Sequence, residues 1–192
     1  MATKNEFDAI VIGASAGGLY TLTSILQPLP ASYRVPIIVV QHRAKDERSL
    51  LEEVLQLKCS IKIKQADEKE VIQRGFVYFA PPDYHLLIES NGTFSLSYDA
   101  RVNYSRPSID VLFETAAAVF KQRLLGIILT GANKDGALGM KKIRALGGTT
   151  IAQQPETADY REMPTAAIST GAIQHVLTPE AIGNFLLDYM NN

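Results

Sequence analysis

The sequence has little of what marks several large classes of protein. Its single cysteine, Cys59, excludes an intrachain disulfide and a metal site built from several cysteines. The formal net charge of -1, without a basic tail, argues against nucleic acid or an anionic membrane as the main partner. No apolar run is long enough to cross a bilayer, and the first six residues carry no signal-peptide core. We therefore expect a cytoplasmic, reduced protein that does not insert into a membrane.

What is present is the pattern of one α/β domain over residues 1–192. A hydrophobic content of 46% supports a sizeable core. Apolar runs without alternation predict buried parallel strands, and stretches of helical spacing separate them. This alternation predicts a doubly wound, mainly parallel sheet flanked by helices. Strands are expected at 8–14, 35–42, 60–64 (an edge strand), 124–130, 149–153 and 172–177. Helices are expected at 19–29, 50–57 (N-cap Ser49), 109–120 (N-cap Ser108), 138–146, 164–169 and from Pro179.

The alternation of strands and helices is interrupted between Val71 and Asp99. Three short strand-like runs follow one another there, separated by prolines and by Asn91-Gly92, a strong hairpin signal. We expect these runs, at 75–80, 85–89 and 93–98, to form a small antiparallel insert beside the parallel sheet.

Three residues of complementary chemistry follow three of the buried strands. Ser15 lies in the glycine-rich turn after the first strand, His42 ends the second, and Asp135 follows the strand at 124–130. The carboxyl ends of parallel strands share one edge of a sheet, so these side chains can meet there. A hydroxyl, an imidazole and a carboxylate are the groups that acyl transfer by serine requires.

Each of these residues has an ordinary alternative. Ser15 could be a small residue of a tight turn, His42 a structural histidine, and Asp135 a turn or N-cap aspartate. His85 and His175, within strands, are expected to be structural. The order Ser, His, Asp differs from that of α/β-hydrolases.

A dinucleotide site is the rival interpretation of the first turn. There Ser15 occupies the place of the middle glycine of G-x-G-x-x-G, and no acidic residue ends the second strand. Both departures disfavour that interpretation, and no P-loop sequence occurs.

Several segments together resemble the catalytic domain of the chemotaxis protein-glutamate methylesterase (CheB) family. They are Gly13-Ala14-Ser15-Ala16-Gly17-Gly18, the strand ending in His42, Arg106-Pro107-Ser108-Ile109-Asp110-Val111-Leu112-Phe113, Leu129-Thr130-Gly131, Asp135-Gly136-Ala137, Met163-Pro164 and Ala166-Ala167. The resemblance implies Ser15 as nucleophile, His42 as base and Asp135 as acid. It implies a glutamate methyl ester on a chemotaxis receptor as substrate, with glutamine deamidation as a second activity. Backbone N–H groups of Ala16, Gly17 and Ala132 are the candidate oxyanion donors, and neither metal nor cofactor is expected.

The sequence departs from the family pattern around the site. No receiver domain is expected in this chain. Either regulation would come from a separate partner or a fused module, or the chain is a constitutive or excised domain. The family commonly has Met-Pro after the histidine and Gly-Met-Gly before the aspartate; here 43–48 is charged and Gly131-Ala132-Asn133-Lys134 precedes Asp135. Arg43, Lys45 and Arg48 could attract an acidic receptor surface or form a solvated loop. Arg101 and Arg106 are expected to be structural. A silent partner-binding module with this fold is the alternative to an active esterase.

Overall fold

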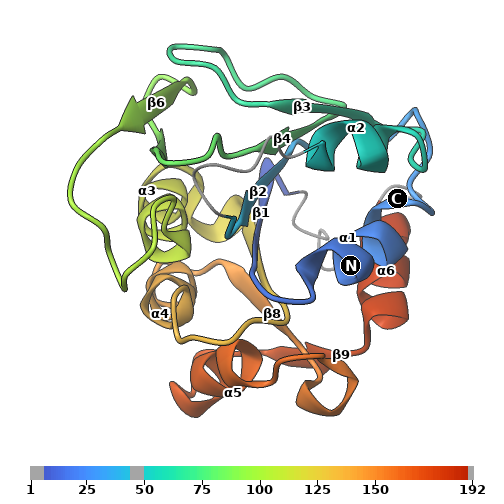
Figure 1. The fold of residues 1–192 in the computed structure, drawn as a ribbon, viewed down its shortest axis with the longest axis vertical. Coiled ribbons are helices and arrows are strands. Elements are labelled where there is room, and N and C mark those ends of the chain that lie inside the picture. Colours follow the sequence, from blue (N-terminus) through green and yellow to red (C-terminus); the bar gives the residue numbers. More distant parts are fainter. Residues whose placement is uncertain (1–6, 44–49, 190–192) are drawn as a thin grey trace, which may run out of the picture.

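The computed structural model describes residues 7–43 and 50–189. Its centre is a sheet of seven strands in the order β3-β4-β2-β1-β7-β8-β9, and all its neighbouring pairs are parallel (Figure 1). The strands are β1 (Ala9–Ala14), β2 (Ile37–Gln41), β3 (Lys62–Gln65), β4 (Phe76–Phe79), β7 (Leu124–Ile128), β8 (Thr149–Gln153) and β9 (His175–Leu177). The predicted parallel sheet is therefore confirmed.

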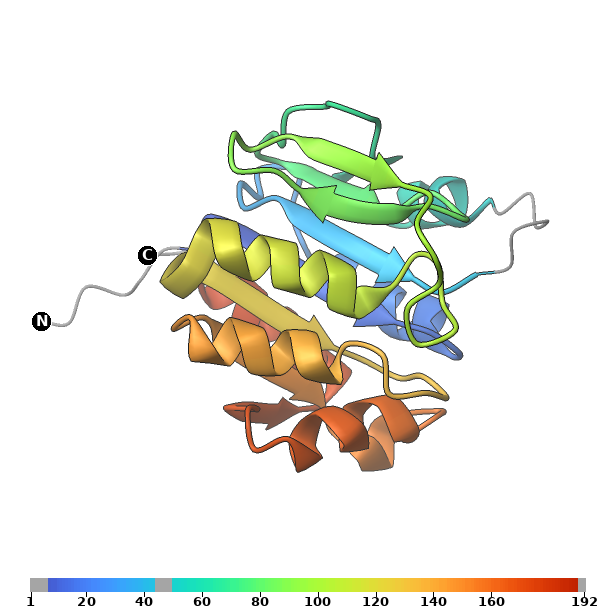
Figure 2. The same cartoon turned by 90° about the vertical axis from the view of Figure 1, so that its left-hand side faces the viewer.

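Helices cover both faces of the sheet, and each face has its own apolar core. One face carries α1 (Gly18–Leu26), α2 (Leu51–Gln56) and α6 (Pro179–Asp188), and the other α3 (Ile109–Phe120), α4 (Ala137–Ala145) and α5 (Glu162–Ser169) (Figures 1 and 2). Alternate residues of β1 supply the two cores: Ile10 and Ile12 pack with the first group, Val11 with the second. This burial on both faces explains why the strands are continuously apolar.

The strands that precede the candidate residues are neighbours in the sheet. β1 lies between β2 and β7, with Ala14 beside Gln41 and Gly13 beside both Val40 and Ile128. From β1 the chain first builds the sheet toward β2 and later returns on the other side with β7. Such a reversal opens a crevice at the carboxyl ends of the strands, where α/β proteins bind ligands. In Figure 2 those ends lie at the right.

The antiparallel insert is smaller than the sequence suggested. Only β5 (His85–Ile88) and β6 (Phe94–Ser97) form the hairpin, and it turns through Asn91 and Gly92 as predicted. The run at 75–80 was assigned wrongly, because β4 pairs in parallel with β2 and β3 in the main sheet. The run carries no signal of direction, since strand pairing is a tertiary property.

Element boundaries differ from expectation by a few residues. Helix α1 ends at Leu26, three residues before the predicted end, and the one-turn shift follows from Pro28 and Pro30. The predicted cap Ser49 lies outside the described residues. Ser108 occupies the N-cap position of α3 as expected. Within the described residues no helix has the length and apolar character that a membrane span needs.

Candidate active site

Ser15 is the first residue after β1, at the start of the turn into α1. Its N–H donates to the Thr130 carbonyl at 2.9 Å, and its carbonyl accepts from Gln41 Nε2 at 2.8 Å. Within residues 7–43 and 50–189 the Ser15 hydroxyl has no hydrogen-bond partner, and the residue is partly exposed. The backbone of Ser15, the predicted nucleophile, is thus held by residues at the ends of both neighbouring strands, while its Oγ carries no bond to a described residue.

His42 and Asp135, 93 residues apart in sequence, meet directly. His42 Nε2 lies 2.9 Å from Asp135 Oδ2, and the two side chains are 12% and 0% exposed. An ionised carboxylate can only accept, so Nε2 carries the hydrogen and donates it. Nδ1 of the neutral ring is then the free base, and it faces the Asn133 amide nitrogen at 3.5 Å.

Asp135 is held by the N-terminus of α3. Its carboxylate accepts from the Ser108 hydroxyl at 2.9 Å and from the N–H groups of Ile109 and Asp110 at 2.7 and 3.2 Å. Burial by itself raises the pKa of Asp135. The hydrogen bonds from His42, Asn103 and Ile109 outweigh this effect, so that its pKa lies below the usual value. Asp135 therefore stays ionised at neutral pH, as an orienting acid must.

A glycine lets α3 come this close. Gly136 has φ +92°, and a Cβ there would lie 2.6 Å from Ile109 Cγ2. A side chain at 136 would therefore push away the first turn of α3, which supplies the donors to Asp135.

Two polar side chains that the sequence analysis did not assign to the site hold the nucleophile turn. The buried Thr130 hydroxyl donates to the Ala16 carbonyl at 2.9 Å. Gln41 Nε2 donates to the carbonyls of both Ser15 and His42, at 2.8 and 3.1 Å. Gln41 is the last residue of β2 and Thr130 follows the end of β7, and this placement at strand ends was the available signal.

The predicted oxyanion donors surround Ser15 as backbone. Within the described part of the chain, the N–H groups of Ala16, Gly17 and Ala132 are bonded to no acceptor. Gly17, with φ +78°, begins α1 at its N-cap. A Cβ on Gly131 would approach Ser15 Cβ to 2.9 Å, so the loop carrying Ala132 packs directly on the nucleophile. Which N–H groups receive an oxyanion remains a prediction.

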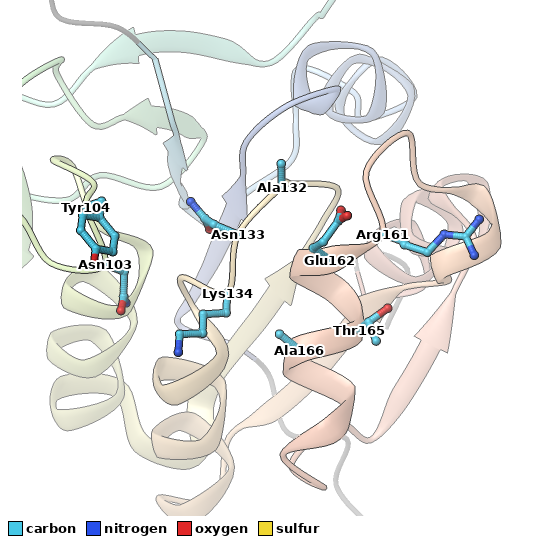
Figure 3. Close-up of a pocket in the computed structure, with 9 residues that line it drawn as sticks. All are labelled: Asn103, Tyr104, Ala132, Asn133, Lys134, Arg161, Glu162, Thr165 and Ala166. Atoms are coloured by element: carbon cyan, nitrogen blue, oxygen red, sulfur yellow. The ribbon is translucent and has the colours of Figure 1, made fainter.

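Two cavities open beside this constellation. One, of about 640 Å³, lies between the turn of Asn103 and Tyr104, the loop of Ala132–Lys134 and the start of α5 (Figure 3). The other, of about 620 Å³, contains Ser15 and runs along α1. One cavity thus borders Ser15, and the other borders the loop that leads to Asp135. Within the described residues, no three His, Cys, Asp or Glu side chains are grouped to hold a metal ion.

Other expectations have mixed outcomes. Arg43 does not present its charge to a partner: its side chain is 4% exposed, pairs with Glu52 of α2 at 2.6 Å and donates to the Ala80 carbonyl at 2.9 Å. Lys45 and Arg48 lie outside the described residues. Arg106 is structural as expected, since it pairs with Asp83 at 2.8 Å. His85 is buried and accepts from the Ser108 N–H.

Comparison with known proteins agrees with this geometry. The family model described as CheB methylesterase matches residues 10–186. The chain belongs to the CheB methylesterase family. A protein of Leptospira interrogans is 50% identical over 182 residues, covering 95% of this chain and 94% of that protein. The protein-glutamate methylesterase/protein-glutamine glutaminase 1 of Carboxydothermus hydrogenoformans is 39% identical, but this chain spans only 54% of its length.

A solved structure confirms the fold that the CheB resemblance implied. The crystal structure of the Thermotoga maritima CheB methylesterase catalytic domain has a TM-score of 0.91 and 35% identity to this chain. The match covers 95% of this chain and 98% of the solved one.

Proposed function

We propose that this chain is a serine hydrolase that removes methyl esters from glutamate side chains. In this proposal Ser15 is the nucleophile, His42 the general base and Asp135 the acid that orients the base. The observation that carries it is the bond between His42 and Asp135, at a strand end whose neighbouring strand leads into Ser15. Among the described residues the Ser15 hydroxyl has no hydrogen-bond partner. The names of the CheB relatives supply the substrate class.

The proposed reaction uses the His42 tautomer that the bond to Asp135 selects. Nδ1 accepts the Ser15 proton while Oγ attacks the ester carbonyl, and the Asp135 charge stabilises the imidazolium. The tetrahedral intermediate collapses, and the leaving methoxide takes the proton from His42 and departs as methanol. Water then attacks the acyl-enzyme with His42 again as base. The products are the free glutamate and the original Ser15.

The negative oxygen of the intermediate needs donors that are already in place. Among the described residues, the donors without an acceptor that lie closest in sequence to Ser15 and Gly131 are the N–H groups of Ala16, Gly17 and Ala132. One such donor lowers the activation barrier of a serine hydrolase by about 3 kcal/mol. Backbone donors make this part of the site insensitive to the Ala16 and Ala132 side chains.

The substrate we assign is a methylated glutamate on a methyl-accepting chemotaxis receptor. A receptor glutamine would react by the same route, with ammonia leaving in place of methanol. The cavity lined by Ser15 and the cavity beside the 132–134 loop support a macromolecular substrate, since each exceeds what one side chain needs. Regulation through a separate receiver or regulatory module belongs to the same proposal.

The test is methanol release from methylated receptor by the wild-type chain, by Ser15→Ala and by Ser169→Ala. Ser169 is an exposed helical serine bonded to the Thr165 carbonyl, so it provides a matched control. We expect release by wild type and Ser169→Ala and none by Ser15→Ala. Release by Ser15→Ala at the wild-type rate would overturn the serine mechanism.

An active-site-directed organophosphonate separates an inactive module from an enzyme with another substrate. Covalent labelling requires a serine activated by its base. A chain that releases no methanol but is labelled at Ser15 acts on a different ester. A chain that is neither active nor labelled is a binding module of the CheB fold.

A further inference from the structure

A second buried carboxylate lies beside the proposed triad. Asp110, in the first turn of α3, is 4% exposed, and its Oδ1 accepts from the Gly139 N–H at 2.7 Å. The Asn103 amide nitrogen lies 2.8 Å from Asp110 Oδ2 and 3.0 Å from Asp135 Oδ1. An amide nitrogen carries two hydrogens, so Asn103 can donate one to each carboxylate. One side chain thus bridges two like charges that would otherwise face each other.

The backbone that carries Asn103 is unusual. Val102 and Ser105 exchange both hydrogen bonds across a two-residue turn, and Asn103 and Tyr104 have φ of +50° and +64°. Two consecutive non-glycine residues in the left-handed region are uncommon, and such backbone is associated with functional positions. Tyr104 is 95% exposed, whereas the Asn103 side chain reaches the buried carboxylates; Figure 3 shows the two diverging. The turn thus directs the Asn103 amide toward the two carboxylates and leaves Tyr104 in solvent.

The two carboxylates have different tendencies to bind a proton. Burial, and then the charge of Asp135, raise the pKa of Asp110, whereas the pKa of Asp135 is lowered. As the pH falls, Asp110 therefore takes up a proton before Asp135 does. The other titratable groups that face the pair among the described residues are His42, Glu114 on α3, His85 through Ser108, and Lys134, Arg161 and Glu162 around the adjacent cavity.

We propose that Asn103 is a positioning residue of the site, which controls how the Asp135 carboxylate acts on His42. Its amide nitrogen donates one hydrogen bond to Asp110 and one to Oδ1 of Asp135. The bond to Oδ1 holds Oδ2 of Asp135 toward His42 and partly neutralises the negative charge of the carboxylate. Its loss leaves more negative charge to stabilise the His42 imidazolium. The pKa of His42 then rises, and the acid limb of the rate profile moves with it. The effect on rate rests on the proposed function, but the effect on His42 does not.

The test is an NMR titration of the His42 ring, which requires no turnover. Asn103→Gly removes the amide and suits the left-handed backbone, and Asn103→Asp keeps the shape but replaces the donor by a third carboxylate. We expect the pKa of His42 to rise by about 0.5 in Asn103→Gly and by about 1 in Asn103→Asp. His85 and His175 in the same spectra are internal references. The acid limb of kcat/KM, measured with a methyl ester, should shift by the same amounts.

Tyr104→Gly is the matched control, because it relaxes the same turn and keeps the amide. The pKa of His42 should not move in this variant. An unchanged pKa in folded Asn103→Gly and Asn103→Asp would overturn the proposal, as would an equal shift in Tyr104→Gly. If the wild type hydrolyses no ester while the His42 shifts appear, the proposed function fails and the role of Asn103 stands.

Discussion

The two ends of the proposed triad are built in opposite ways. Asp135 is fully buried and accepts hydrogen bonds from five groups: His42 Nε2, Asn103 Nδ2, Ser108 Oγ and the N–H groups of Ile109 and Asp110. The Ser15 hydroxyl is partly exposed and bonds to none of the described residues. Folding therefore fixes the acid completely, whereas the nucleophile is fixed only through its backbone.

This difference separates stability from chemistry. Besides His42, the donors to Asp135 come from the start of α3 and from the turn at Asn103, so the carboxylate joins three segments at the sheet edge. Ser15 contributes little to that network, and its hydroxyl is free to meet substrate. Acyl transfer by a serine requires a carboxylate that is already fixed in place and a hydroxyl that is free to attack. In the proposed triad Asp135 would supply the first and Ser15 the second.

The largest expected effect tests this contrast directly. Asp135→Asn should lower kcat by about 10³- to 10⁴-fold, because the amide favours the wrong tautomer of His42. It should also lower the free energy of unfolding by about 2–4 kcal/mol, since its NH₂ would face donors of α3. Ser15→Ala should abolish turnover with unchanged stability. Urea denaturation beside ester hydrolysis checks both variants, and equal stability losses would refute the contrast.

A smaller effect concerns the position of Ser15. In Gly131→Ala the new Cβ would lie 2.5 Å from Met163 Cε and 2.9 Å from Ser15 Cβ. Met163 can move, but the nucleophile must shift as well, and we expect kcat to fall about 10- to 100-fold. Gly183→Ala in α6 is the control, because its nearest neighbour would be 3.6 Å away. Wild-type kcat in Gly131→Ala would show that the loop adapts without disturbing Ser15.

The smallest effect is the pH dependence of stability. The folded-state pKa of Asp135 is lowered, so its contribution is fully present above the unfolded value of about 3.9 and is lost as pH falls through the folded pKa. Asp110 has a raised pKa and acts oppositely, losing its contribution as pH rises above about 4. Unfolding free energies measured from pH 3 to 7 should therefore fall less steeply below pH 4 in Asp135→Asn than in wild type. Parallel curves would contradict this account.

Much of the architecture was readable from the sequence because burial leaves a periodic pattern. The apolar runs before Ser15, His42 and the 131–136 loop predicted β1, β2 and β7, and the structure places these three strands side by side. Ser108 was correctly placed at the start of α3. The pattern failed for β4, because a short apolar strand looks the same in a parallel and an antiparallel pairing.

What the sequence by itself determined is the set of strand ends and the chemical groups that follow them. Only the tertiary structure decided how those groups are held: that α3 begins on Asp135, that Asn103 bridges it to Asp110, and that Arg43 turns inward to Glu52. The physical reason is one of range. Periodicity and turn chemistry act over a few neighbouring residues. The contacts around Asp135 instead join residues as far apart as His42 and Asp135, which are separated by 93 positions, and they exist only once the sheet is packed.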